Sequence, residues 1–540
     1  MDEKSTTDGV DRISDLPPFI IHHILSNLAA KELARTSVLS KRWKNLRASF
    51  PILDFHQNYF LNFDEKYLVG NELELGLESN EKFGGCIENF MRFIDVTVLR
   101  FCKLNFCMKR FGITVSFVDV EGLSSSLDKW IGLAVENDVK ELDLSILTDQ
   151  TKLYTLPQIV FSARSLTSLK LGGCKLEQTS DSIRFRYLKK LILQWVHINE
   201  HMVHKLTSEC PLVEELSFDS CWGFKCFCIP KHRNLLSLSI YASLDELESV
   251  EIVVPSLRHL SIAFPEQLTR PCVINIAGCQ QLRDLHFMGG IFKDLEFNHL
   301  VSKFALLENL RVDRCHFLER VKVSSTRLQN LSFRTCGNLK AIDVSTPNLL
   351  SFYYVNHPVP MPAIFSPCPG VVATDKRGID PYCYYKIKAF LGVACPIKNL
   401  IIYVSPKRNS FNLDDYRRTL PSLSREIGNL SLHSSISPSV DDSALLNDLL
   451  RICYPRNLSV VTRNEGQKKF VEWLYAQLAN RDENCCNSQR RKCWRHFLKD
   501  FKVEGFLMLE DDKPIHIDNL MDSLPLLPPG TYRFRLIWHR

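Results

Sequence analysis

Residues 328–333 read LQNLSF, an apolar-x-x-apolar-x-apolar hexamer that occurs ten times in the middle of this 540-residue chain. Other copies are LTSLKL at 166–171, LKKLIL at 188–193 and LRHLSI at 257–262. The alternation at the end of the hexamer predicts a short strand that buries every second side chain. The ten hexamers begin at Val139, Leu166, Leu188, Val213, Leu235, Leu257, Leu282, Leu307, Leu328 and Leu349.

Successive hexamers start 21 to 27 residues apart, a period within the roughly 20–29 residues of a leucine-rich repeat. One such repeat cannot bury its apolar face alone, so stacked repeats are expected to build a parallel sheet with the rest of each repeat looping back behind it. The sequence therefore predicts an α/β fold in which residues 139–356 form a leucine-rich-repeat solenoid, or horseshoe. The outward residues of its strands would be the binding surface.

The 19 cysteines are expected to be reduced. The chain opens MDEKSTTDGV, which lacks the basic start and apolar run of a secretory signal, so we expect an intracellular location, nuclear or cytoplasmic, without disulfides. Four thiols follow the last apolar residue of a hexamer by three positions, where leucine-rich repeats place Asn or Cys to turn the chain inward. These four, expected to be structural, are Cys174, Cys221, Cys315 and Cys336.

The segment 11–50 carries +4 of the net charge of +6 and suits an acidic partner. It holds three short helical patterns, LPPFIIHHILSNL from Leu16, KELARTSVL from Lys31 and KRWKNL from Lys41. Three such helices bury too little apolar surface to be stable alone, so a partner is expected to cover them. The net charge is too small to predict nucleic-acid binding, and no stretch has the ~20 apolar residues of a membrane span.

Residues 11–46, DRISDLPPFIIHHILSNLAAKELARTSVLSKRWKNL, resemble a plant F-box nearly end to end. The resemblance implies a three-helix domain that docks to a Skp-type adaptor, which joins F-box proteins to a cullin. It implies that Lys41 and Arg42 face acidic adaptor groups and that the apolar docking residues are Leu16, Pro17, Ile24, Leu25, Val38, Leu39 and Trp43. By helical pattern alone the segment is equally a cap of the next domain, with Trp43 and Ile24 in its core.

The flanks are less regular. Residues 1–10 are expected to be a disordered tail. Residues 51–138 are too apolar for a flexible linker, so this connector is expected to hold irregular first repeats or a cap. Five prolines end the regular repeats, and residues 357–540 are expected to hold irregular repeats and an amphipathic helix at 468–478. The stretch CWRHFLKDFKVEGF, residues 493–506, resembles the C-terminal region of plant F-box/leucine-rich-repeat proteins and partly their FBD module.

The outward strand residues form a mixed polar row, which fits protein recognition better than a nucleic-acid backbone. Arg311 and Arg334 are expected to lie in register on neighbouring strands, with Tyr353 next in line. Arg and Tyr are favoured at binding hot spots. We therefore predict that His286, Arg311, Arg334 and Tyr353 contact a target protein. For each of them the alternative is a solvated side chain on an exposed sheet.

The sequence gives little support for a catalytic, phosphate-binding or metal-binding site. A Gly-rich phosphate loop, a G-x-S-x-G elbow and an H-E-x-x-H motif are absent from the sequence, so we expect neither a catalytic residue nor a cofactor. Two metal-like clusters lack the spacing of zinc ligands, and no metal is expected. They are Cys221, Cys226, Cys228 with His232, and Cys485, Cys486, Cys493 with His496. The run 490–492 is either a nuclear-import signal or a solvated loop.

Together these patterns predict a non-catalytic substrate receptor of an SCF-type (Skp, cullin, F-box) ubiquitin ligase. The F-box would anchor the ligase while the solenoid holds a target protein, which raises the local concentration of target lysines. Three alternatives stay open: a hormone-type receptor whose surface is completed by a small molecule, a repeat scaffold without a ligase role, and a Cys/His enzyme built on one of the clusters.

Overall fold

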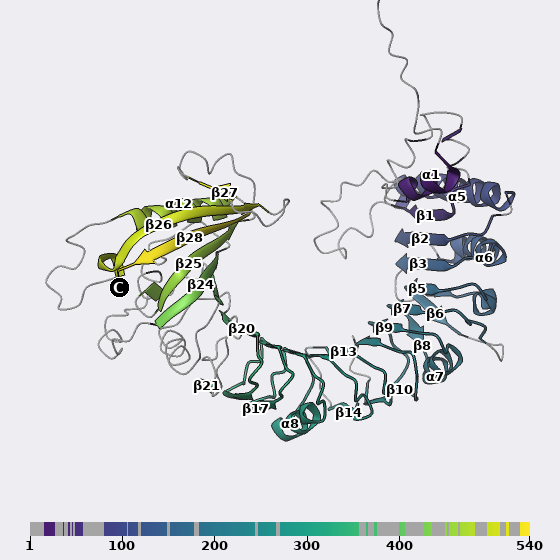
Figure 1. Ribbon diagram of the computed structural model, residues 1–540. Coiled ribbons are helices and arrows are strands. Elements are labelled where there is room, and N and C mark those ends of the chain that lie inside the picture. Colours follow the sequence, from purple (N-terminus) through teal and green to yellow (C-terminus); the bar gives the residue numbers. More distant parts are fainter. Residues whose placement is uncertain are drawn as a thin grey trace, which may run out of the picture. The chain divides into compact units, whose positions relative to one another are not determined.

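The structure is a computed structural model (Figure 1). It divides into a first unit, Met1–Leu257 with Val273–Gly278, and a second unit, Arg258–Cys272 with Cys279–Arg540. The residues that it describes are 16–26, 36, 42–43, 46, 49–57, 80–104, 106–116, 120–147, 152–177, 183–242, 247–265, 271–355, 363–364, 372–374, 399–404, 425–434, 446, 449–450, 453–462, 465–480, 494–507, 515–517 and 530–539.

The F-box-like segment contains helix α1 (Pro18–Leu25). The carbonyl oxygen of Pro17 accepts hydrogen bonds from the amides of Ile20 and Ile21 at 3.0 and 3.2 Å. Proline suits this start because the first-turn amides of a helix lack intrahelical acceptors. The two further predicted helices lie mostly outside the described residues, and the described positions in them are helical: Thr36, Arg42, Trp43 and Leu46.

Four buried side chains form the core of this segment: Ile21, Leu25, Trp43 and Phe50. Leu16, Leu46 and Ile52 pack against the core while keeping some exposure. Ile52 is also the first residue of strand β1 (Ile52–His56). The apolar core of the helical segment therefore continues directly into the first strand of the sheet.

The main sheet of the first unit is parallel, and its strands lie side by side in chain order. They are β1, β2 (Arg110–Ser116), β3 (Glu141–Leu147), β5 (Ser168–Gly172), β7 (Lys190–Gln194), β9 (Glu215–Asp219) and β11 (Ser237–Tyr241). Shorter parallel sheets are β4 (Tyr154–Thr155), β6 (Cys174–Leu176), β8 (His197–Ile198), and β10 (Cys226–Ile229), β12 (Ser249–Ile252), β14 (Val273–Asn275). Helices are α5 (Asn80–Cys102), α6 (Val120–Glu136), η2 (Gln158–Ser162) and α7 (Glu200–Glu209).

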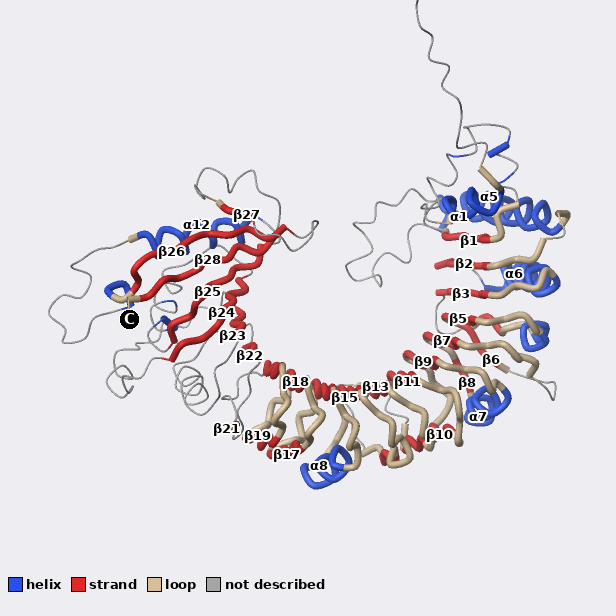
Figure 2. Tube along the Cα trace, viewed as in Figure 1, coloured by secondary structure: helices blue, strands red, loops and turns tan. Residues whose placement is uncertain are grey.

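The second unit begins with the same architecture. Its parallel strands are β13 (His259–Ala263), β15 (Asp284–Met288), β16 (Asn309–Asp313), β18 (Asn330–Arg334) and β20 (Ser351–Val355). A second parallel sheet holds β17 (Arg320–Ser324), β19 (Ala341–Ser345) and β21 (Ala363–Ile364), and helix α8 (Asp294–Ser302) precedes β17. Figure 2 shows this alternation of strands and loops by colour.

The second unit ends in a seven-stranded sheet in which the direction of the strands changes. β22 (Val372–Thr374), β23 (Asn399–Val404), β24 (Arg425–Ser434) and β25 (Cys453–Thr462) are parallel. Antiparallel strands follow in the order β28 (Gly530–Trp538), β26 (Leu498–Leu507) and β27 (Ile515–His516). The predicted helix at 468–478 falls within α12 (Glu465–Ala479), and the short η3 (Trp494–His496) precedes β26. This mixed sheet differs from the repeats before it.

The predicted solenoid repeats are confirmed. Each of the ten hexamers holds a strand that begins two residues after the hexamer starts, as β16 begins at Asn309 after Leu307. Neighbouring strands pair so that equivalent positions face each other, and Leu310 opposes Leu331. Both leucines are buried. Burial of one such side chain stabilises the fold by about 1.5–3 kcal/mol, so the repeated leucines hold the register.

Six of these strands are followed by a residue whose backbone adopts the left-handed conformation. It follows the strand directly and has a φ between +53° and +71° at Gly173, Trp195, Ser220, Gly289, Arg314 and Thr335. At five of the six, all but Thr335, the amide donates to the carbonyl oxygen of the last residue of the next strand, as from Gly289 to Asp313 at 2.8 Å. The chain thus leaves the sheet at the same point in each of these repeats.

The four predicted structural cysteines are buried, and each lies two residues after the last residue of its repeat's strand in the main sheet. The Cys315 thiol donates to the carbonyl oxygen of Gly289 at 3.0 Å, and the Cys336 thiol to that of Val312 at 3.5 Å. Burial raises the pKa of Cys174, Cys221 and Cys336 to about 12. The thiols of Cys221, Cys315 and Cys336 therefore bond one repeat to its predecessor, and the burial of all four cysteines confirms their structural role.

Candidate target-binding surface

One row of outward side chains crosses five strands of the second unit. Successive pairs are in register, from Ser261 and His286 to Arg311, Ser332 and Tyr353. On these strands the neighbours of the row whose burial is described, such as Leu310 and Val312 beside Arg311, are buried, so the row lies on the other face of the sheet from the core. Three of the four predicted target contacts therefore share one line.

The fourth predicted contact, Arg334, lies one step off this row. Arg311 faces Ser332, and Arg334 faces Asp313, so the prediction that Arg311 and Arg334 are in register is wrong. Pairing aligns the starts of the hexamers, and Arg311 is the fourth residue after its start whereas Arg334 is the sixth. The guanidinium of Arg334 nevertheless lies 4.4 Å from the centre of the Tyr353 ring. Arg334 and Tyr353 are thus joined by a cation–π contact rather than by register.

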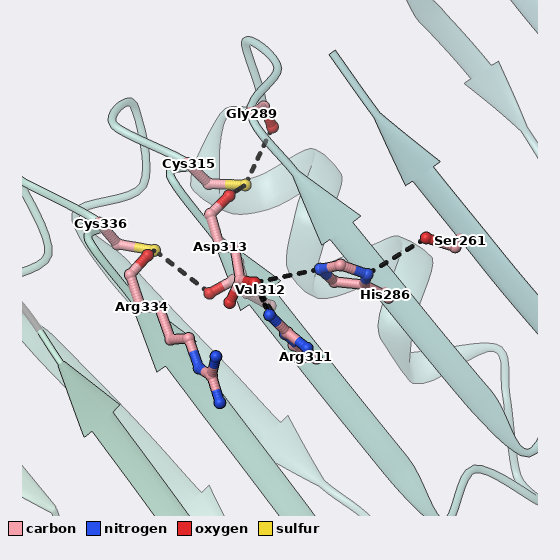
Figure 3. Close-up of polar contacts among 9 residues, drawn as sticks. All are labelled: Ser261, His286, Gly289, Arg311, Val312, Asp313, Cys315, Arg334 and Cys336. Carbon is pink, nitrogen blue, oxygen red and sulfur yellow. Dashed lines mark hydrogen bonds and ion pairs between the residues drawn. The ribbon is translucent and has the colours of Figure 1, made fainter. Parts of the chain in front are cut away.

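Asp313 is the centre of the polar contacts on this surface (Figure 3). Its Oδ2 lies 3.2 Å from Nε2 of His286, 2.7 Å from Nε of Arg311 and 2.6 Å from Nη2 of Arg311. Nδ1 of His286 lies 3.1 Å from the hydroxyl of Ser261. The Asp313 side chain is 6% exposed, whereas that of Arg311 is 46% exposed. A nearly buried carboxylate therefore holds two of the predicted contact residues in place.

The pKa of Asp313 is lowered despite its burial. Loss of solvation alone would raise this pKa, but hydrogen bonds from His286 and Arg311 and the charge of Arg311 outweigh that effect. The carboxylate is therefore ionised at neutral pH. Sequence reasoning did not single out Asp313 as the organiser. The available signal was its spacing of two residues from Arg311, which puts both side chains on one face of a strand.

The described residues among the predicted adaptor contacts fall into an accessible set and a buried set. Pro17 and Arg42 are exposed, Ile24 is 36% exposed and Leu16 is half-buried. Leu25 and Trp43 are buried in the core of the F-box-like segment, at 0% and 4% exposure. Val38, Leu39 and Lys41 lie outside the described residues.

Arg42 also ties the segment together. Its Nη2 donates to the carbonyl oxygen of Leu16 at 2.8 Å, which joins the start of α1 to the third helical pattern. Within this chain Leu25 and Trp43 support α1, and Pro17, Ile24 and Arg42 offer accessible atoms. The alternative placement of Ile24 in a core does not match its exposure, whereas Trp43 does lie in one.

In the first metal-like cluster, both ring nitrogens of His232 form hydrogen bonds with the backbone. Nδ1 of His232 accepts the amide of Leu235 at 3.1 Å, so Nε2 carries the proton and donates to the carbonyl oxygen of Cys210 at 3.0 Å. Cys221 donates to the carbonyl oxygen of Leu193 at 3.5 Å. Within the described part of the chain, no group of three or more Cys, His, Asp or Glu residues is arranged to hold a metal. Cys485, Cys486 and Cys493 of the second cluster lie outside it.

Sequence comparison adds three domain matches. Residues 13–48 match the F-box domain. Residues 127–289 match the leucine-rich repeats of the FBD-associated F-box protein At5g56370, and residues 268–365 match the leucine-rich-repeat domain of At1g61320/AtMIF1. This chain carries the F-box and the leucine-rich repeats of a plant F-box/LRR protein.

Two relatives from Arabidopsis thaliana match in different ways. The putative F-box/LRR-repeat protein At5g41840 is 31% identical over 264 residues, which are 47% of this chain and 43% of the relative. The FBD-associated F-box protein At1g66310 is 25% identical over 495 residues, or 89% of this chain and 96% of the relative. The chain thus spans less than half of the first relative and nearly all of the second. Among the described helices, none has the length and apolar character needed to cross a bilayer.

Proposed function

We propose that this chain is the non-catalytic substrate receptor of an SCF-type ubiquitin ligase. In this role the F-box at residues 13–48 docks to a Skp-type adaptor, and through it to a cullin, while the repeats bind a target protein. The order of the two matched domains, F-box first and leucine-rich repeats after it, carries the proposal. The expectation of a nuclear or cytoplasmic location stays a prediction.

The surface of the F-box segment supports adaptor docking. The exposed side chains of Pro17 and Ile24 are apolar, and Arg42 brings a positive charge to the same segment. An apolar anchor with a charged rim is the usual composition of a stable protein interface. Leu25 and Trp43 are proposed to act indirectly, by holding α1 from its buried side.

The repeat surface supports binding of a protein. The row from Ser261 to Tyr353 presents hydroxyl, imidazole, guanidinium and phenol groups in fixed register. Contacts with Asp313 restrict His286 and Arg311 before any partner arrives. Side chains that are ordered in advance lose less entropy on binding, which favours a specific interface.

Co-purification with a Skp-type adaptor tests the anchoring half of the proposal. Replacement Ile24→Asp puts a charge on the proposed contact face, and we expect at least a tenfold loss of recovered adaptor, because a buried unpaired charge costs several kcal/mol. Ile159→Asp is the matched control, since Ile159 in η2 is exposed to 37%, almost the same as Ile24. Equal adaptor recovery from both variants would contradict the proposal.

Ubiquitination assays test the second half. A complex of the full chain with adaptor, cullin and ubiquitin carrier is expected to modify a captured target only while the F-box is intact. Because the chain supplies no reacting group in this proposal, target ubiquitination should also need the carrier enzyme. Modification of a target by the isolated chain would rule out a non-catalytic role.

A further inference from the structure

Unpaired polar atoms gather on two neighbouring strands of the second unit. Among the described residues, seven buried side-chain nitrogen or oxygen atoms have no hydrogen-bond partner, and three of them lie on β16 and β18. These three are Asp313 Oδ1, Ser332 Oγ and Arg334 Nε. An unpaired buried polar group destabilises the folded state, so such groups are uncommon in folded proteins. Their concentration here indicates a surface shaped for something other than stability.

The three positions form a compact arrangement on the outward face. Ser332 lies between Arg311 on β16 and Tyr353 on β20 in register. Arg334 is two residues further along the strand of Ser332, so both side chains project from one face. The hydroxyl of Ser332 is thus bordered by an arginine on its own strand and by another on the neighbouring strand.

The two arginines differ in their contacts. Arg311 is bound to Asp313 through two nitrogen atoms. Arg334 makes no ion pair with a described carboxylate, and the Tyr353 ring holds its guanidinium in place at 4.4 Å. In Figure 3 the Arg334 guanidinium extends away from the dashed contacts of Asp313. Arg334 is therefore a positioned cation that still has donors to offer.

The charges of Arg311, Asp313 and Arg334 together favour an anion as the ligand of this surface. Arg311 and Asp313 neutralise each other, and Arg334 leaves one positive charge. A cation is disfavoured because Asp313 Oδ2 already accepts from His286 and Arg311, while Oδ1 is buried. One unneutralised guanidinium matches the single charge of a carboxylate better than the nearly double charge of a phosphate.

We infer that Ser332 and Arg334, with Tyr353 as support and Arg311 at the edge, form a carboxylate-binding site for an Asp or Glu side chain of the target protein. The inference rests on the proposed function, since it specifies what the repeat surface binds. The carboxylate would accept from the hydroxyl of Ser332 and from the guanidinium of Arg334. Bonds between charged groups of this kind are about twice as strong as neutral ones, so a single acid would dominate the preference of the site.

Binding of short labelled peptide pools to the purified full chain tests this inference. The pools share random flanks and carry Glu, Gln, Lys or phosphoserine at one central position, and fluorescence anisotropy reports their affinity. We expect the Glu pool to bind at least about fivefold more tightly than the Gln pool, an effect the size of the difference between a charged and a neutral hydrogen bond. Arg334→Gln should bring this ratio close to one, and Ser332→Ala should lower it by a smaller factor.

The matched control is Arg320→Gln, because Arg320 is an exposed arginine of β17 in the other sheet and its loss changes the net charge equally. It should leave the ratio unchanged. Arg334→Lys keeps the charge and should retain most of the ratio, which separates a folding defect from loss of the carboxylate-binding site. Equal binding of the Glu and Gln pools, or equal losses in the variants of Arg320 and Arg334, would overturn the inference.

Preference for phosphoserine without preference for Glu would also overturn it, in favour of a phosphate site. Adaptor recovery is measured on the same samples. A chain that prefers Glu peptides but does not retain the adaptor would refute the proposed ligase role and leave the carboxylate-binding site intact. A chain that retains the adaptor but shows no preference for Glu peptides would refute the carboxylate-binding site alone.

Discussion

Arg311 and Asp313 are two residues apart on β16, and two nitrogen atoms of the arginine lie 2.7 and 2.6 Å from the same carboxylate oxygen. Because alternate residues of a strand share a face, this ion pair is built within one strand and needs no partner strand to form. His286 from β15 completes it at 3.2 Å. The His286 contact therefore joins β15 to β16, and the Arg311–Asp313 pair fixes the direction of a guanidinium on the proposed binding surface.

Replacement Asp313→Asn tests how much this contact stabilises the fold. The variant loses the charge that Arg311 and His286 face, and we expect the free energy of unfolding to fall by about 1–2 kcal/mol. The estimate stays below that for a fully buried pair because Arg311 is nearly half exposed. Urea denaturation measures it. Asp343→Asn on β19 is the control, since Asp343 makes no ion pair with a described residue, and an equal loss there would contradict the role of Asp313.

The same pair predicts a pH dependence. Because the pKa of folded Asp313 lies below its ordinary value of 3.8, its contribution is complete above about pH 3.8 and is lost as the pH falls through the lower folded value. The stability difference between the natural chain and Asp313→Asn should therefore persist from neutral pH to about 3.8 and shrink below it. A difference that vanishes near neutral pH would contradict this assignment.

Thiol reactivity provides a separate test of the repeats. Burial raises the pKa of Cys336 to about 12 and that of Cys315 well above its ordinary value, whereas Cys107 and Cys226 are exposed. The thiolate is the reactive form, so alkylation at a pH of about 8 should modify the exposed pair and spare the buried pair. Mass spectrometry after a short iodoacetamide pulse identifies the sites. Urea should make all four reactive, and fast labelling of Cys315 in the folded chain would contradict its structural role.

The strands were predictable because one spacing recurs. The offset of two residues between Leu307 and Asn309 holds in all ten hexamers. β1 and β2 were not located individually, because their starts are 58 residues apart, more than twice the repeat period. A periodic pattern reports only on elements that share the period.

The contacts of the binding surface were less predictable. Counting from the hexamer starts would have placed Arg334 opposite Asp313, but the arginines alone suggested a shared register. The role of Asp313 depends on three donors that come from two strands, and no local pattern contains them. In the F-box segment, helical spacing could not separate Leu25 and Trp43, which this chain buries, from Ile24, which it exposes.

Substitution of Gly289 tests the importance of the left-handed turn that follows a strand. It directly follows β15 with a φ of +71°, and a Cβ atom there would lie 2.7 Å from the backbone carbonyl oxygen of Phe264. Replacement Gly289→Ala combines left-handed strain with this clash, so the free energy of unfolding should fall by about 1–3 kcal/mol. Thermal or urea unfolding of the purified chain measures the loss.

Gly132→Ala is the opposite case and serves as the control. Gly132 lies inside α6, and a Cβ atom there would meet nothing within 4 Å. Because alanine loses less backbone entropy than glycine in a helix, this variant should gain about 0.5–1 kcal/mol. The two identical substitutions should therefore shift the unfolding midpoint in opposite directions. A gain for both would mean that the turn after β15 tolerates a side chain and that its left-handed geometry does not constrain the repeat.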